Sequence, residues 1–128
     1  MSIFGRSNGR PGVVQVAQHV DDLDRATAFY TDVLGVPLIA RFGPLVFLDL
    51  GGTRLLLEEA APPAMIYLQV EDLAHRLDSL RAAGVEVVTE PHDIFVDTDG
   101  VFGGNWKTET QAFIRDSEGN LVGLVTHS

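Results

Sequence analysis

Histidine and carboxylate side chains are the groups in this sequence that could do chemistry, because the chain contains no cysteine. That absence excludes thiolate nucleophiles, disulfides and Cys-ligated metals. Glu58 and Glu59 are adjacent in a strand-like run, so their carboxylates point to opposite faces and do not form the close pair that acid–base catalysis uses. His92, within "TEPHDI", is a candidate general base or ligand-binding group because imidazole titrates near neutral pH. A histidine that stabilises a turn is the alternative.

Aromatic residues alternate with glycines in the segment from Pro91 to Lys107, which is predicted to be a long insert. Phe95, Phe102 and Trp106 on a glycine-hinged loop would suit a lid that stacks on a flat ligand. A β-hairpin arm that contacts a second subunit is the alternative. The sequence has no Gly-rich phosphate-binding loop and no G-x-S-x-G motif, so it indicates neither nucleotide nor serine-hydrolase chemistry.

Composition narrows the class of protein. With 128 residues, 45% hydrophobic and 21% charged, the chain is long enough for one globular domain. A net charge of -9 argues against nucleic acid as a partner and suits a neutral or cationic small molecule. No apolar run approaches the roughly 20 residues that span a bilayer. We therefore expect no membrane partner, a cytoplasmic location, and a flexible tail over residues 1–12.

Two successive runs of elements are predicted to position these residues. Each run is strand, helix and three further strands. The first run comprises strand 12–20, helix 23–34 and strands 37–42, 45–50 and 53–59. A proline-containing linker over 58–64 separates it from the second run. The second comprises strand 65–70, a helix from Leu73 to a stop at Gly84, strand 85–91 and the hairpin strands 110–116 and 120–127.

The two runs match in more than the order of their elements. The signature Val20-Asp21-Asp22-Leu23 matches Val70-Glu71-Asp72-Leu73, with Asp22 and Asp72 as predicted N-caps. Gly35-Val36 and Gly84-Val85 both follow a predicted helix, where a left-handed glycine ends it. The sequence therefore predicts an internal repeat of two βαβββ modules, 13–60 and 64–128, within a single α+β domain over 13–128.

These signatures, together with the closing "FIRDSEGNLVGLV", resemble the vicinal oxygen chelate superfamily of glyoxalase I, bleomycin-resistance proteins and extradiol dioxygenases. The likeness covers nearly all of the chain from about Val13 onward. It implies curled mixed sheets, a pocket inside each cupped sheet and completion by a homodimer.

Metal enzymes of that superfamily take ligands from the first and last strand of each module, which the resemblance places at Gln15, Leu56, Met65 and Gly123. Zinc and iron prefer imidazole and carboxylate, so we expect no metal cofactor. A divalent metal would be expected only if this alignment is wrong. A displaced cluster of His19, Glu58 and His127 is the alternative, although His127 lies next to the last residue of the sequence and could fray.

The resemblance also implies which side chains meet a ligand. Gln15 and Met65 are predicted to line a cavity, with the filling of a closed barrel as the alternative. Tyr67 shares the parity of Met65, and a buried tyrosine bonded to the backbone is the alternative. The full set predicted to bind ligand is Gln15, His19, Met65, Tyr67, Trp106 and Phe113, and the predicted catalytic candidates are His92 and Glu58.

We therefore expect a small-molecule-binding protein of the glyoxalase/bleomycin-resistance type that lacks the usual divalent metal. The alternatives are an enzyme of the same superfamily, of lyase, isomerase or dioxygenase type, with a divergent or metal-free site, and a protein whose sheets only mediate assembly.

Overall fold

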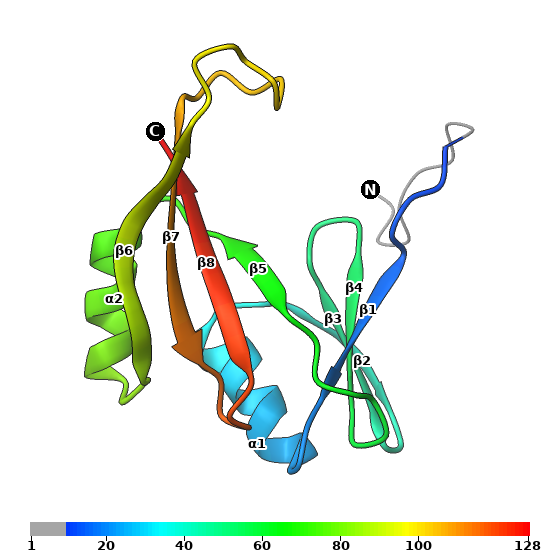
Figure 1. Cartoon of the computed structure of the whole chain (residues 1–128). Helices are drawn as coiled ribbons and strands as arrows, with labels where there is room; N and C mark the ends of the chain where they lie inside the picture. The colour runs from blue at the N-terminus through cyan, green and yellow to red at the C-terminus, as the bar shows by residue number, and fades with distance from the viewer. Residues whose placement is uncertain (1–9) are drawn as a thin grey trace. The chain divides into compact units, whose positions relative to one another are not determined.

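The computed structural model describes residues 10–128 of the chain (Figure 1). These residues form two compact units that meet in the sequence between Ala64 and Met65. The predicted tail over 1–12 therefore lies mostly outside the described residues. Within residues 10–128, neither helix has the length and apolar character needed to cross a membrane.

The first unit contains one four-stranded sheet in the order β1-β4-β3-β2. β1 pairs in parallel with β4, and the other two pairings are antiparallel. Its elements are β1 (Gln15–His19), α1 (Leu23–Ala28), a π-helical turn η1 (Phe29–Val33), β2 (Leu38–Phe42), β3 (Leu45–Asp49) and β4 (Arg54–Glu58).

The second unit repeats this arrangement in the order β5-β8-β7-β6, again with the first and last strands parallel. Its elements are β5 (Ile66–Gln69), α2 (Leu73–Ala82), β6 (Val87–Val96), β7 (Thr108–Arg115) and β8 (Leu121–His127). Figure 1 shows α2 lying along one face of this sheet. The predicted α+β class and the twice-used βαβββ order are thereby confirmed.

The helix ends follow the predicted chemistry. Asp22 accepts a hydrogen bond from Arg25 N at 3.0 Å, and Asp72 accepts one from His75 N at 3.1 Å, as N-caps do. Gly35 and Gly84 have φ values of 75° and 84°, the left-handed conformation that ends a helix at low cost for glycine.

The first helix differs from the expectation of a continuous α-helix over 23–34. It changes after Ala28 to a π-helical turn, in which Leu34 N donates to Phe29 O. Two threonine hydroxyls bond back to carbonyls four residues earlier, from Thr27 to Leu23 at 2.7 Å and from Thr31 to Thr27 at 2.9 Å. Such bonds compete for the helical acceptors and favour irregular turns.

Each sheet buries one face under its own helix. In the second unit, α2 packs against β6 and β8 with its leucine stripe of Leu73, Leu77 and Leu80. Full burial of each such leucine stabilises the unit by about 1.5–3 kcal/mol. The strand residues buried on that face are Ile66, Ala112, Ile114, Val122 and Leu124. In the first unit, α1 packs against β4, and the buried set is Ala26, Tyr30, Val46, Leu48, Leu55 and Leu57.

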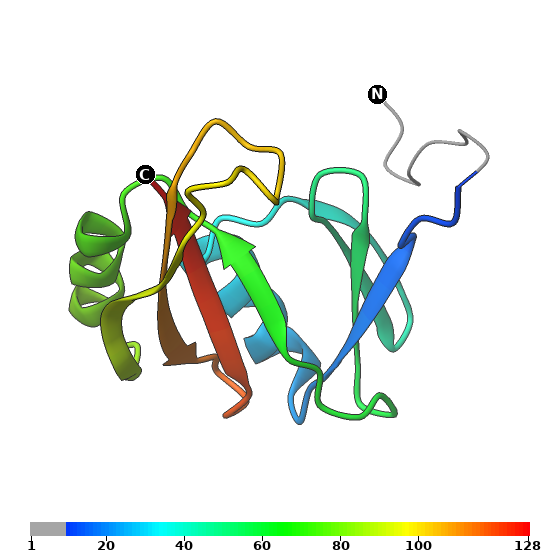
Figure 2. The same ribbon diagram turned by 45° about the horizontal axis from the view of Figure 1, so that its top comes forward.

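The predicted insert over 91–107 is shorter than expected, because β6 continues to Val96. Pro91 interrupts neither the strand nor the sheet, since β6 is an edge strand and its register shifts between Thr89 and His92. Only residues 97–107 form the loop, which closes the β6–β7 hairpin (Figure 2). His127 likewise does not fray, because β8 includes it and pairs it with Glu109.

Among the described residues of the first unit, one polar side chain is fully buried in the sheet. Gln18 on β1 is fully buried, and its amide exchanges two hydrogen bonds with the backbone of Ala64, both at 2.9 Å. Its carbonyl oxygen also accepts from His19 N at 3.0 Å. The Gln18 amide thus pairs with the backbone N–H and C=O of Ala64 as a neighbouring strand would. These bonds hold the end of the linker beside β1.

We predict that Gln18→Met lowers the free energy of unfolding by about 2 kcal/mol, measured by urea denaturation. Methionine has a similar volume but leaves the N–H and C=O of Ala64 without these partners. Gln15→Met on the exposed end of the same strand is the matched control and should change stability by no more than about 0.5 kcal/mol. Equal losses in both variants would contradict the role given to Gln18.

Candidate functional site

The face of the second sheet that points away from α2 carries half-exposed aromatic and polar side chains, and we call it the open face. Strand register places these side chains in three rows across the sheet. The rows are Tyr67–Gly123–Phe113–Thr89, then Gln69–Val125–Gln111–His92, then His127–Glu109–Phe95. Aromatic rings therefore lie at both ends of the face, and amide, imidazole and carboxylate groups lie between them.

Irregular pairing of β6 decides which of its residues reach the open face. Three register shifts occur along its pairing with β7. Thr89, His92 and Phe95, each three residues apart, therefore stand opposite the open-face residues of β7, where regular alternation would have spaced them by two. Bulges of this kind re-aim side chains and protect a sheet edge from further pairing.

Gly123 makes room for an aromatic pair at one end of the face. A Cβ at this position would lie 2.5 Å from Cδ2 of Tyr67 and 3.2 Å from Cε1 of Phe113. The two rings meet edge to face with centroids 5.9 Å apart, and Tyr67 remains 51% exposed. The ring of Tyr67 therefore occupies the space that a side chain at position 123 on β8 would need.

Glu109 organises the other end of the face. One carboxylate oxygen accepts a hydrogen bond from Nε2 of His127 at 2.9 Å, and the other accepts from Nε2 of Gln111 at 2.8 Å. Trp106 stacks on the His127 ring with centroids 3.9 Å apart and planes 4° apart. The imidazole is therefore fixed by a carboxylate at its edge and an indole on its face.

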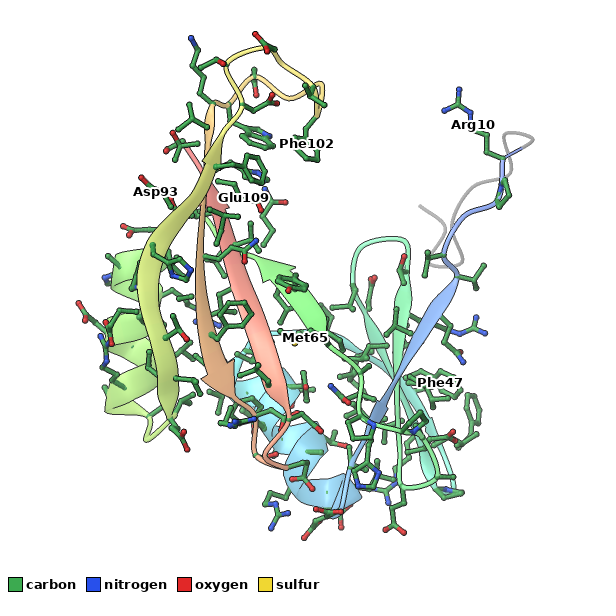
Figure 3. All side chains as sticks on the ribbon, in the orientation of Figure 1. Arg10, Phe47, Met65, Asp93, Phe102 and Glu109 are labelled. Atoms are coloured by element: carbon green, nitrogen blue, oxygen red, sulfur yellow. The ribbon has the colours of Figure 1, made fainter. Side chains whose placement is uncertain are left out.

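The loop over 97–107 brings a second aromatic layer to this end. Phe102 stacks on Phe95 and Trp106, with centroid separations of 5.1 and 5.9 Å. Asp97 is buried and anchors the loop, since its carboxylate accepts from the N–H groups of Val101 and Phe102 at 2.8 and 3.0 Å. Figure 3 shows Phe102 and Glu109 at the same end of the sheet.

The first sheet has a corresponding open face of different chemistry. Gln15 accepts a hydrogen bond from Nε of Arg54 at 2.7 Å, and the Arg54 guanidinium lies 5.6 Å from the centre of the Phe47 ring. Ala17, Leu56 and Phe47 share the next row. This face therefore presents one cation beside an apolar row in which Leu56 is buried.

The ring of His19 bonds to neighbouring groups of the first unit through both of its nitrogens. Its Nδ1 contacts the carbonyl oxygens of Glu59 and Ala61 at 2.9 and 3.0 Å, and its Nε2 contacts Asp21 at 2.8 Å. All three partners are acceptors, so they favour the doubly protonated ring. The hydrogen bond to Asp21 is the largest cause that raises the pKa of His19 above its ordinary value of 6.5, and the two carbonyls add to it.

The predicted site residues divide between the two units. In the second unit, Tyr67 and Phe113 touch each other, Trp106 lies at the far end with His127, and Met65 is 46% exposed just before β5. The structure corrects the placement of His92, which lies within β6 and not at the strand's exit. Its Nδ1 contacts Glu90 O at 3.0 Å.

In the first unit, Gln15 reaches Arg54, and His19 stands opposite Glu58 in the β1–β4 register. Three open-face residues, Glu109, Gln111 and Phe95, were not among the predicted site residues of the second sheet. The alternation in "TETQAF" ahead of Phe113 was a signal for Glu109 and Gln111. Phe95 had no such signal, because a bulge places it there.

The four positions to which the resemblance assigns metal ligands carry poor donors in the structure. Gln15 bonds Arg54, Leu56 is buried, and Gly123 is covered by Tyr67. Across residues 10–128, no three or more His, Cys, Asp or Glu side chains gather in a group that could hold a metal ion. The expectation of a metal-free site stays a prediction.

Comparison with known proteins gives the family. The family model of the Glyoxalase/Bleomycin resistance protein/Dioxygenase superfamily matches residues 12–124. The chain belongs to this superfamily. No curated protein matches the chain in the corresponding search.

Three solved structures illustrate how widely the fold is shared. A lactoylglutathione lyase from Agrobacterium tumefaciens is 23% identical, with 93% of this chain and 96% of that chain covered and a TM-score of 0.68. TnmS3, an antibiotic-binding protein from Streptomyces sp. CB03234, is 22% identical over 95% of this chain and 100% of its own, with a TM-score of 0.71. TioX from Micromonospora sp. ML1 is 22% identical over 92% and 100%, with a TM-score of 0.68. These likenesses show the fold alone.

We predict that Gly123→Ala lowers the free energy of unfolding by about 1–2 kcal/mol, because the new methyl group must displace the Tyr67 ring. In a Tyr67→Ala background the same substitution should cost less, since the ring is gone. Urea denaturation of the single and double variants gives the coupling energy, expected at about 1 kcal/mol. Additive losses would show that the ring does not occupy this space.

A second prediction follows from the raised pKa of His19. A group whose pKa is higher in the folded state stabilises the protein below its unfolded pKa. That contribution is lost as the pH rises through the folded value. The melting temperature should therefore fall as the pH rises above 6.5, and Asp21→Asn should reduce that fall. NMR titration of the His19 ring should show a lower pKa in Asp21→Asn, whereas Asp99→Asn, an exposed acid in the other unit, should leave it unchanged.

Proposed function

We propose that this chain binds a planar organic small molecule on the open face of the second sheet, and that it does so without the divalent metal of the superfamily's metal enzymes. The observation that carries the proposal is the arrangement of rings at both ends of a face that no helix of its own unit covers. Tyr67 and Phe102 are 51% and 65% exposed, so their surfaces are available to stack on a ligand.

Polar groups between the rings would orient such a ligand. Gln111 and Glu109 already hold each other at 2.8 Å, which fixes their positions before a ligand arrives. Preorganised groups lose little conformational freedom on binding, and that favours affinity. The description of the related TnmS3 as an antibiotic-binding protein supports a binding role for this fold.

The donor set supports binding without metal. The four positions that metal enzymes of the superfamily use are occupied here by Gln15, Leu56, Met65 and Gly123. Among their side chains, the amide of Gln15 is the one oxygen donor, and it is a weak one. Zinc and iron need several imidazole or carboxylate ligands, so these positions would not retain the ion.

One observation favours an enzyme as the second candidate. Nδ1 of His92 contacts the carbonyl oxygen of Glu90 at 3.0 Å, so Nδ1 carries the hydrogen in the neutral ring. Nε2 is then the basic nitrogen, on an exposed ring in the central row of the open face. His92 could therefore accept a proton from a bound substrate. Glu58, the other candidate base, belongs to the first unit.

The test uses proflavine, a planar cation, followed by calorimetry and by quenching of the single tryptophan, Trp106. Tyr67→Ala should weaken proflavine binding about three- to tenfold, because it removes one stacking surface. Val88→Ala, a similarly exposed position on β6, is the matched control and should leave binding unchanged. Absence of proflavine binding, with binding of S-hexylglutathione in its place, would favour the enzyme. Stoichiometric divalent metal retained through dialysis would overturn the metal-free assignment.

A further inference from the structure

Where β8 extends beyond β5, the second unit has a pocket that the proposed binding face does not explain. β5 ends at Gln69, and the chain then turns into α2, whereas β8 continues to His127 paired only with β7. The resulting pocket has a volume of about 500 Å³ and is lined by Gln69, Val70, Glu71, Thr126 and His127. This volume is within the range of small-molecule sites.

The pocket adjoins the open face through two of its lining residues. Gln69 shares the central row with Gln111, and His127 shares the third row with Glu109. A ligand stacked on the open face could therefore extend a substituent into the pocket.

The lining offers hydrogen-bond acceptors and contains neither lysine nor arginine. A carboxylate only accepts, so Nε2 of His127 carries the hydrogen in its bond to Glu109, and Nδ1 of the neutral ring is the acceptor. Across residues 10–128 the structure gives no hydrogen-bond partner to that Nδ1 or to the side chains of Gln69 and Glu71. The hydroxyl of Thr126 already bonds the carbonyl oxygen of Glu71 at 2.9 Å.

Two neighbouring side chains fix the orientation of the His127 ring. Its side chain is 22% exposed, with the indole of Trp106 on one face and Glu109 at one edge. The carboxylate of Glu109 is 17% exposed and places a second negative charge behind the ring. The imidazole cannot rotate away without losing both contacts, so it presents a fixed acceptor.

We propose that this pocket binds the ammonium group of an organic amine, with Glu71 as the counter-ion and Gln69 and Nδ1 of His127 as acceptors. An ammonium has three donors and no acceptor, which matches a pocket that offers several acceptors and has no lysine or arginine in its lining. The net charge of -9 would assist the approach of such a ligand. The proposal rests on the proposed function insofar as the amine belongs to a molecule stacked on the open face.

The pocket is tested alone with n-butylammonium chloride, with n-butanol as the neutral control at equal salt. Saturable NMR shifts are expected at the backbone amides of residues 69–71 and 126–127 with the ammonium and not with the alcohol. Glu71→Gln should weaken ammonium binding about tenfold, because it removes a charge-assisted hydrogen bond. Glu86→Gln, an exposed acid just before β6, is the control and should have no effect. The proposal is overturned if shifts are absent, or if Glu71→Gln and Glu86→Gln bind equally well.

The link to the open face is tested with 2-naphthylmethylamine and its neutral counterpart 2-naphthylmethanol by calorimetry. At least tenfold tighter binding of the amine, lost in Glu71→Gln, supports both proposals. Equal binding of the two compounds overturns the ammonium site and leaves the proposed function intact. Butylammonium shifts without binding of either naphthyl compound would support the pocket and overturn the stacking face.

Discussion

The parallel pairing of the first and last strands in each module is the interaction on which the rest of the structure depends. β1 lies beside β4 and β5 beside β8, and parallel neighbours require the chain to cross over one face of the sheet. In each module the crossover contains the only α-helix of that unit's described residues, and the helix buries its apolar stripe on that face. One face becomes core, and the other is not covered by that unit's own helix.

The two open faces differ in chemistry although they share one architecture. The first presents Arg54 held by Gln15 above Phe47, whereas the second presents Glu109 held between His127 and Gln111. The first face has a positive charge near an aromatic ring, and the second has a carboxylate that accepts two hydrogen bonds. These groups attract partners of opposite charge. The two modules therefore share a scaffold but not the chemistry of their open faces.

Local rules were sufficient wherever one residue and its neighbours decide the conformation. The N-caps Asp22 and Asp72, and the left-handed glycines Gly35 and Gly84, were predictable because capping involves only contacts within one turn. Strand parity likewise placed Tyr67 on the open face. The same rules failed at Pro91, because an edge strand tolerates a missing N–H that a central strand does not.

The sequence by itself determined the repeated βαβββ modules, their family, and the poor metal donors at Gln15, Leu56, Met65 and Gly123. These features depend on residue type and periodicity, which are written along the chain. Only the tertiary structure decided that His127 is held by Glu109 and Trp106, which lie 18 and 21 positions before it in the sequence. Strand register and the β6 bulges bring such groups together, and long-range pairing leaves no local signal in the sequence.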